Sequence, residues 1–213
     1  MAKLKIYTFP DIVLAQKAQP VARVEKSMHK LADDMLETMY HAPGIGLAAN
    51  QVGILQRVLV LDTEYDYEEF PEEIDPPVSV EGAEVVTGGV IRNKNPIIVI
   101  NPEIILSEGS ILFEEGCLSV PDFNAQVKRF KKIKLKYLDV DGLEQTLTAE
   151  GLLAVAIQHE MDHLEGRLFI DRLSPLKKEM TKKKLLKERR QHDEDVRDGF
   201  FPESKRRGKK DFR

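Results

Sequence analysis

The sequence predicts an α+β fold in which antiparallel strands pack around one buried helix that carries metal-binding side chains. Short strand-like segments separated by turn residues crowd the region 96–148. An almost continuous apolar run without proline follows at 149–164, which is typical of a buried helix. The motif His-Glu-x-x-His, from His159 to His163, lies on that helix. Because the strands precede the helix and do not alternate with helices, we expect antiparallel pairing.

The composition is that of an ordinary globular chain, 213 residues long with 42% hydrophobic and 32% charged residues. No apolar run approaches the roughly 20 residues that cross a bilayer, and the first residues lack the features of a signal peptide, so we expect no membrane partner. Cys117 is the single cysteine, which excludes an internal disulfide and predicts a cytoplasmic location.

The first quarter of the chain is predicted to hold one helix and one glycine-rich turn. Apolar residues recur with helical spacing over 24–40, and Pro43 and Gly44 end that helix. No strand precedes the turn Gly44-Ile45-Gly46-Leu47-Ala48-Ala49-Asn50-Gln51 and no lysine follows its second glycine, which disfavours phosphate binding. Close approach of a ligand or another backbone is favoured instead. Gln51 is then either a placed hydrogen-bond donor or a structural amide.

A buried strand is predicted at 57–62, followed by a strongly acidic segment. Residues 62–84 include ten acidic residues and no Lys or Arg, so this segment is expected to be a solvated surface loop. The acidic stretch belongs to an expected insertion at 62–89. Asp141-Gly142 is expected to form the turn of a late hairpin. Further strands are predicted at 96–101, 104–106, 111–113, 133–138 and 144–148.

The His-Glu-x-x-His motif predicts a metal site. His159 and His163 are four residues apart, so on a helix they project from one face, about 6 Å apart along the axis. They continue an apolar stripe that includes Leu152 and Val155. Two exposed histidines on a polar turn are the alternative, but the apolar helix favours burial, and burying histidines without a partner is costly. Glu160 is close enough to act on a metal-bound water without binding the metal.

A catalytic site of this kind needs a third protein ligand, and Cys117 is the best candidate. A free cysteine is most often a small buried hydrophobic residue. Two histidines are, however, an incomplete set, and His192, the only later histidine, lies in a charged tail. The predicted site is therefore one thiolate and two imidazoles.

Three motifs together resemble those of the peptide deformylases, in the family's order. They are the turn from Gly44 to Gln51, the segment Glu115-Gly116-Cys117-Leu118-Ser119, and the segment Gln158-His159-Glu160-Met161-Asp162-His163. The resemblance covers roughly residues 6–173. It implies a deformylase-like fold and removal of the N-formyl group from nascent polypeptides that begin with formylmethionine. It also implies one divalent metal ion, natively Fe2+, with Zn2+, Ni2+ or Co2+ able to replace it.

The resemblance also implies roles for individual residues. Cys117, His159 and His163 would bind the metal ion, which activates a water molecule for attack on the formyl carbon. Glu160 would accept the proton of that water and later deliver it to the departing amine. The family pattern assigns the backbone N–H of Leu118 and the side-chain amide of Gln51 to the developing oxyanion.

Substrate contacts are implied by the same resemblance. The methionine side chain would lie near Ile45, Leu152, Val155 and the ring of His159. Gly46 and Gly116 would let the substrate backbone approach as an extra strand. Glu115 and Arg129 match a carboxylate and an arginine that the family pairs, which indicates a structural role.

Two features depart from the family pattern. Asn124 stands where an arginine is often found, so the resemblance does not extend to contacts with downstream substrate residues. The acidic insertion at 62–89 exceeds what short family members carry, and it either rims the active site or has no catalytic role.

The C-terminal segment is predicted to be a basic appendage. From residue 172 onward there are 16 Lys and Arg against 8 Asp and Glu, whereas the whole chain has a net charge of −4. We expect a catalytic domain at 1–173, a basic helix within 173–190 and a disordered end, so that 174–213 forms the appendage. Either this appendage is simply solvated, or it binds ribosomal RNA near the site where nascent chains emerge.

Three classes of function remain open on the sequence. A metal-dependent deformylase leads, followed by a zinc peptidase of the His-Glu-x-x-His type and a catalytically silent ribosome-binding protein with the same fold. The upstream cysteine disfavours the peptidase, and the intact set of site residues disfavours the silent protein.

Overall fold

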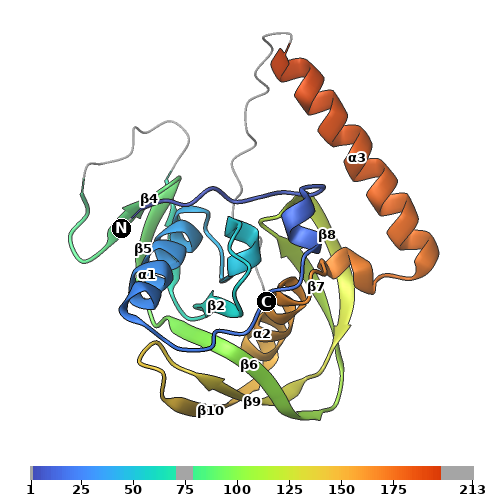
Figure 1. Cartoon of the computed structure of the whole chain (residues 1–213). Helices are drawn as coiled ribbons and strands as arrows, with labels where there is room; N and C mark the ends of the chain where they lie inside the picture. Colours follow the sequence, from blue (N-terminus) through green and yellow to red (C-terminus); the bar gives the residue numbers. More distant parts are fainter. Residues whose placement is uncertain (1, 71–78, 198–213) are drawn as a thin grey trace.

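The computed structural model of the chain describes residues 2–70 and 79–197. Its helices are α1 (Lys26–His41), α2 (Gly151–Leu164) and α3 (Pro175–Arg197), with short 3-10 helices η1 (Ile12–Ala15), η2 (Ala49–Val52) and η3 (Phe169–Arg172). Figure 1 shows α2 in the interior, surrounded by α1 and the strands, whereas α3 lies at the periphery. The predicted α+β class is confirmed.

The largest sheet has five strands, all antiparallel, and it forms the wall against which α2 packs. The predicted strands 96–101 and 104–106 are one continuous strand, because register shifts allow it to bend without ending. In spatial order the strands are β1 (Gly46–Ala48), β2 (Val58–Leu61), β6 (Ile97–Glu108), β9 (Lys132–Leu138) and β10 (Glu144–Glu150).

A long hairpin of β7 (Ile111–Cys117) and β8 (Val120–Arg129) positions the cysteine motif. Cys117 pairs with Val120, so the thiol lies at the closed end of the hairpin. The second strand was not predicted, since its proline, Asp122 and Asn124 are typical of turns. Pairing along the whole hairpin overrides that local preference, and Val127 and Arg129 of β8 are buried.

The expectation that the acidic segment is a loop is wrong for part of its described residues, those at 66–69 and at 84. A small sheet forms from β3 (Asp66–Glu69), β5 (Gly89–Arg92) and β4 (Glu84–Val86), in that order. Val86, Val90 and Ile91 are buried, and this apolar burial anchors the sheet even though its outer side chains are acidic. Residues 71–78 of the predicted insertion lie outside the described part.

Helix α2 is held in the interior by its small and apolar side chains. Ala154, Ile157 and Leu164 are fully buried against residues of β2, β6 and β9. Burying a side chain such as Ile157 contributes roughly 1.5–3 kcal/mol. The helix starts two residues later than predicted, because β10 continues to Glu150 and Gly151 turns the chain with a φ of 60°.

Helix α3 begins at a proline, as a first helical turn allows, and extends to Arg197, beyond the predicted end. Thr181 and Leu185 are its buried residues among those whose side chains are described. The Lys182 ammonium lies 2.7 Å from the Asp171 carboxylate, and Arg189 donates to the Thr8 hydroxyl at 2.7 Å. The predicted disordered end, 205–213, lies outside the described residues. Within them, no helix has the length and apolar character required to cross a bilayer.

Candidate metal centre

Cys117, His159 and His163 come together in the interior. The end of β7 supplies the cysteine, and one turn of α2 supplies both histidines. One ligand atom of each residue lies within 4.8 Å of the other two, and Cys117 Sγ is 3.2 Å from His163 Nε2. His159 is 8% exposed and His163 is 1% exposed, which excludes two solvent-exposed histidines.

The cluster fits a divalent cation. Tetrahedral coordination with ordinary metal–sulfur and metal–nitrogen bonds places the two donor atoms about 3.5 Å apart, close to the observed separation. Two donors point at the sulfur: the Ser119 backbone N–H at 3.4 Å and the Gln51 Nε2 at 3.6 Å. Such donors stabilise a thiolate, which is the form that binds metal.

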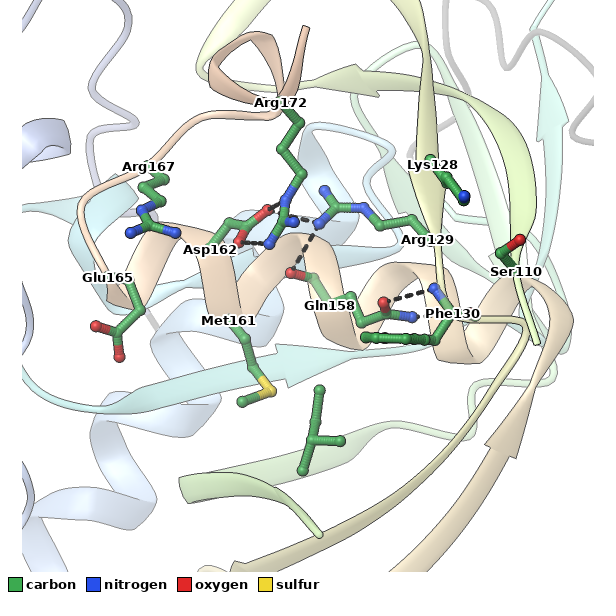
Figure 2. Close-up of a pocket in the computed structure, with 11 residues that line it drawn as sticks. Ser110, Lys128, Arg129, Phe130, Gln158, Met161, Asp162, Glu165, Arg167 and Arg172 are labelled. Atoms are coloured by element: carbon green, nitrogen blue, oxygen red, sulfur yellow. Dashed lines mark hydrogen bonds and ion pairs between the residues drawn. The ribbon is translucent and has the colours of Figure 1, made fainter. Parts of the chain in front are cut away.

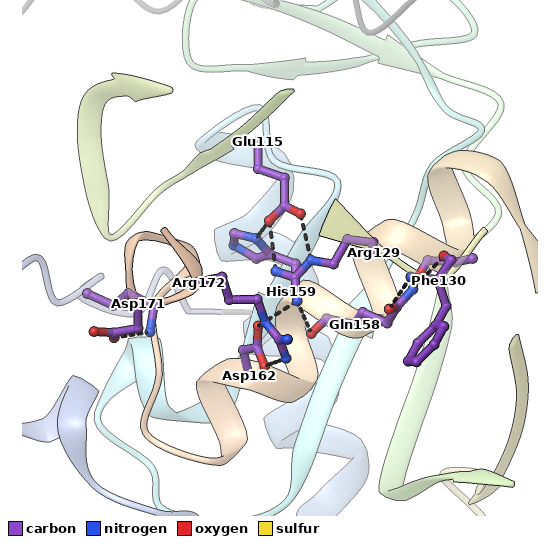
Figure 3. Close-up of polar contacts among 10 residues, drawn as sticks. Glu115, Arg129, Phe130, Gln158, His159, Asp162, Asp171 and Arg172 are labelled. Atoms are coloured by element: carbon purple, nitrogen blue, oxygen red, sulfur yellow. Dashed lines mark hydrogen bonds and ion pairs between the residues drawn. The ribbon is translucent and has the colours of Figure 1, made fainter. Parts of the chain in front are cut away.

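His159 is oriented by a chain of charged side chains that is buried from Glu115 to Asp162 and reaches the surface at Arg172 (Figure 3). Its Nδ1 lies 2.8 Å from Glu115 Oε2, which leaves the other ring nitrogen for the cluster. Arg129 donates to both oxygens of Glu115, at 2.6 and 2.9 Å, and to Asp162 at 2.6 Å. Arg172 in turn donates to both oxygens of Asp162, at 2.6 and 2.5 Å. The pairing of Glu115 with Arg129 is therefore as expected, and it is one link of a longer network.

The protonation of these groups follows from burial and from their partners. Burial alone would raise the pKa of Glu115, but the hydrogen bonds from Arg129 and His159 lower it to about 2. Burial would lower the pKa of His159, but the sulfur of Cys117 and the Glu115 carboxylate raise it well above its usual value. Burial and the neighbouring His159 hold the pKa of His163 well below its usual value. His163 is therefore neutral, the form that binds metals.

Glu160 lies beside the cluster with one carboxylate oxygen that has no hydrogen-bond partner among the described residues. The residue is 4% exposed, and burial raises its pKa to about 7. Gly46 of β1 makes room for it, because a Cβ at this position would lie 2.5 Å from Glu160 Oε1. The absence of a side chain at Gly46 therefore makes room for Glu160, in addition to the expected approach of a substrate backbone.

Gln51 is fixed between the turn and the cysteine motif. Its Oε1 accepts the Ala48 backbone N–H at 2.8 Å, and its Nε2 donates to the Ser119 hydroxyl at 3.1 Å. Its amide therefore faces the sulfur of Cys117. Leu118 follows Cys117 in the tight end of the hairpin and is half-buried.

The expected substrate-contacting residues are distributed over three elements. Ile45 packs against the core beside β1, while Leu152 and Val155 lie on α2, half-buried and buried respectively. Gly116 lies on β7, where a Cβ would meet Asn124 Oδ1 at 2.6 Å. Ile45 and Gly46 thus lie at the edge of the large sheet, while Gly116 belongs to the hairpin.

Several residues around the site were not predicted. Asp162 and Arg172 extend the charge network, and Phe169 stacks on the His159 ring with centroids 5.9 Å apart. Ser119 binds both Gln51 and Cys117. The position of Asp162 within the His-Glu-x-x-His motif could have indicated that this residue is buried. Nothing in the local sequence distinguishes Arg172 or Phe169, since both contacts depend on how the chain returns after α2.

The fold and the site together define a class: an α+β protein with a buried Cys/His/His cluster suited to a divalent cation and a carboxylate poised beside it. Comparisons with known proteins show the family to which the chain belongs. A family model described as polypeptide deformylase matches residues 3–179. A peptide deformylase of Xylella fastidiosa is 50% identical over 194 residues, covering 89% of this chain and 98% of the relative.

Solved structures give the same result. A peptide deformylase from Legionella pneumophila has a TM-score of 0.71 at 39% identity, covering 90% of this chain and 98% of that one. One from Ehrlichia chaffeensis in complex with actinonin has a TM-score of 0.71 at 36% identity, covering 88% and 98%. The chain belongs to the polypeptide deformylase family.

Membership confirms the resemblance given by the three motifs, together with the enzyme class. The family consists of metal-dependent hydrolases that act on formylmethionine at the start of nascent chains. A deformylase is therefore supported over a zinc peptidase or a silent ribosome-binding protein.

Proposed function

We propose that this chain removes the N-formyl group from nascent polypeptides, with Cys117, His159 and His163 as metal ligands and Glu160 as the group that moves the proton. The observation that carries the proposal is the buried Cys/His/His cluster with an unpaired Glu160 oxygen beside it. A bound divalent cation would supply a Lewis acid that activates water at neutral pH. We propose Fe2+ as the native ion, with Zn2+, Ni2+ or Co2+ as replacements, since one thiolate and two imidazoles suit all four.

Glu160 would accept a proton from the attacking water and return it to the amine that leaves. A general base works best when its pKa is near the operating pH, and the buried position of Glu160 supports this role. The side chain of Gln51 and the backbone N–H of Leu118 would donate to the oxyanion that develops on the formyl oxygen. The two hydrogen bonds that fix the Gln51 amide support this assignment, because a fixed donor needs no reorganisation.

The substrate would bind as an extended strand between β1 and the hairpin. Within the described residues, β1 pairs on one side only, with β2, so its other edge can accept main-chain hydrogen bonds. Gly46 and Gly116 would flank the substrate backbone, and the methionine side chain would contact Ile45, Leu152, Val155 and the His159 ring. Recognition of backbone and first side chain would let one enzyme process many nascent chains.

The test is release of formate from a formyl-Met dipeptide by anaerobically purified protein, with the metal content measured on the same sample. We expect about one metal ion per chain and rapid formate release, which Glu160→Ala reduces by roughly 10²–10⁴-fold without loss of metal. Actinonin, found in the complex from Ehrlichia chaffeensis, should block the reaction. Cleavage of internal peptide bonds without formate release would point to the peptidase instead.

We further propose that residues 1–173 form the catalytic domain, including the 62–89 insertion, and that 174–213 form a basic appendage that binds ribosomal RNA. The family match, which ends at residue 179, supports this division. Lys177, Lys183 and Lys187 are exposed on α3 and have no ion-pair partner in the described part of the chain. A cytoplasmic location is part of the same proposal.

Ribosome binding can be tested without removing α3. A Lys177→Gln/Lys183→Gln/Lys187→Gln variant should bind ribosomes more weakly. The slope of the logarithm of affinity against the logarithm of salt concentration should become shallower by about one unit for each lysine that contacts a phosphate. Hydrolysis of a formyl dipeptide should not change. Lys26→Gln/Lys131→Gln/Lys134→Gln is the matched control, because these lysines are equally exposed but lie elsewhere. Equal ribosome affinity of both variants, or unchanged affinity after deletion of 174–213, would refute the appendage's role.

A further inference from the structure

A cavity of about 390 Å³ lies on the side of α2 opposite to the metal cluster. Its lining comes from β6, from the open end of the β7–β8 hairpin, from α2 and from the segment 165–172, which ends with η3. Gln158, Met161 and Asp162 of α2 line the cavity (Figure 2). His159 and His163 of the same helix belong instead to the cluster with Cys117. The cavity is therefore separate from the deformylase site, and binding of a ligand there does not depend on the proposed function.

The cavity is lined by more cationic than acidic side chains. Both of its acids are already paired: Asp162 with Arg129 and Arg172, and Glu165 with Lys17 and Arg57. The remaining two cations, Lys128 and Arg167, have no ion-pair partner within residues 2–70 and 79–197. Both are exposed. Two positive charges are thus available to a ligand.

These two charges lie at opposite ends of the cavity. Figure 2 shows Lys128 beside Ser110 at one end and Arg167 beside Glu165 at the other. Between them Figure 2 shows the charged side chains of Arg129, Asp162 and Arg172, which are bonded to one another. The apolar part of the lining comes from Phe130, Met161 and Ile104 and lies to one side of this cluster. Phe130 is 47% exposed, so its ring is open to contact by a ligand.

We propose that this cavity binds a small dicarboxylic acid with an apolar spacer. One carboxylate pairs with Lys128 and accepts from the Ser110 hydroxyl, and the other pairs with the Arg167 guanidinium, which suits a planar anion. The spacer covers Phe130, Met161 and Ile104, and removal of this apolar surface from water adds to the affinity. A volume of this size is typical of small-molecule sites.

Binding can be followed on the full-length, metal-loaded protein by NMR of labelled Ile and Met methyl groups. The probes are unbranched dicarboxylates of about five to ten carbons, monocarboxylates of equal length, and inorganic phosphate. We expect one dicarboxylate length to shift the Ile104 and Met161 signals at low millimolar concentration or below, about fivefold more tightly than the matched monocarboxylate. The signals of Met35 and Met39, which lie in a different core cluster, should not move.

Substitutions at the two ends decide between this proposal and a general anion site. Lys128→Gln and Arg167→Gln should each reduce dicarboxylate affinity to that of the monocarboxylate, and both residues are exposed, so the variants should fold. Lys26→Gln and Arg23→Gln remove equivalent exposed charges elsewhere and should have no effect. The proposal is overturned if chain length has no influence, if phosphate binds as well as the dicarboxylate, or if the methyl signals do not respond to any probe.

Discussion

Helices α2 and α3 differ strongly in how far their side chains are buried. Ten of the 14 residues of α2 are buried, including two histidines, a glutamate and an aspartate. Helix α3 is longer and more highly charged, yet Thr181 and Leu185 are its buried residues among the described side chains. The ion pairs within this helix, such as Arg189 with Asp193, are largely exposed.

The difference shows that a charged side chain needs an oppositely charged partner when it is buried. The number of charges on a helix does not decide this. On α3 a charged side chain is solvated and needs no partner. On α2, Asp162 is buried and is bound by Arg129 and Arg172, and Arg129 must then be neutralised by Glu115 as well. Each buried charge thus requires the next, and the chain of charges ends at His159 of the metal cluster.

The largest effect on stability is expected for Arg129→Leu. Removal of this guanidinium leaves the buried Glu115 carboxylate without its arginine and weakens the pairing of Asp162, which should cost about 3–5 kcal/mol of unfolding free energy. For a chain of this length that corresponds to a fall in Tm of roughly 6–20 °C, measurable by calorimetry. Arg92→Gln, which breaks the exposed pair with Glu68, is the control and should change stability by less than about 1 kcal/mol. Similar shifts for both variants would remove the distinction between buried and exposed charges.

Gly46→Ala tests the catalytic face of α2. The added Cβ would lie 2.5 Å from Glu160 Oε1, so the carboxylate must move away from the position it now occupies. Displacement of a general base should lower kcat for formate release by about 10²-fold, while the metal content stays at one ion.

The control for this glycine lies two residues earlier. At Gly44 an added Cβ would meet the end of the Leu118 side chain at 2.9 Å, a group that can turn aside. Gly44→Ala should therefore retain most of the activity. If Gly46→Ala also retained wild-type kcat, the close approach of Gly46 and Glu160 would have no catalytic meaning.

A smaller effect is expected where α3 joins the body. Burial would raise the pKa of Asp171, but Lys178 and Lys182 lower it to about 2. Because the folded pKa lies below the ordinary value of 3.8, the ionised carboxylate stabilises the fold above about pH 4, and this contribution is lost as the pH falls towards 2. Asp171→Asn should lower stability by about 1 kcal/mol at neutral pH.

Hydrogen exchange on α3 measures this attachment. In the wild type, protection of α3 amides should decrease between pH 4 and 2 relative to that of α2, whereas in Asp171→Asn the ratio should be low and independent of pH in that range. A pH-dependent ratio of equal size in the variant would assign the effect to other groups.

The smallest effect is expected at Arg189. Its hydrogen bond to Thr8 and its pair with Asp193 are partly exposed, so Arg189→Gln should alter the unfolding free energy by no more than about 0.5 kcal/mol in urea titrations. A loss above about 2 kcal/mol would mean that solvated charges on α3 matter as much as buried ones on α2.

The sequence by itself determined the parts that depend on short spacings. The interval between His159 and His163 and the apolar run before them were sufficient for α2, because helical periodicity is a local property. The same is true of the Asp141-Gly142 turn, which joins β9 and β10 as expected. Cys117 was the best candidate for the third donor because two histidines are an incomplete ligand set and the later His192 lies in a charged tail.

Tertiary structure decided everything that depends on contacts between distant segments. The strand β8 and the small acidic sheet form against local preference, since pairing and apolar burial outweigh the propensities of Asp, Asn and Glu. The same reason explains why Arg172 binds Asp162, why Phe169 stacks on His159 and why Gly46 makes room for Glu160. A one-dimensional pattern specifies which side chains share a helix face, but the partners that satisfy a buried charge are fixed only when the chain folds back upon itself.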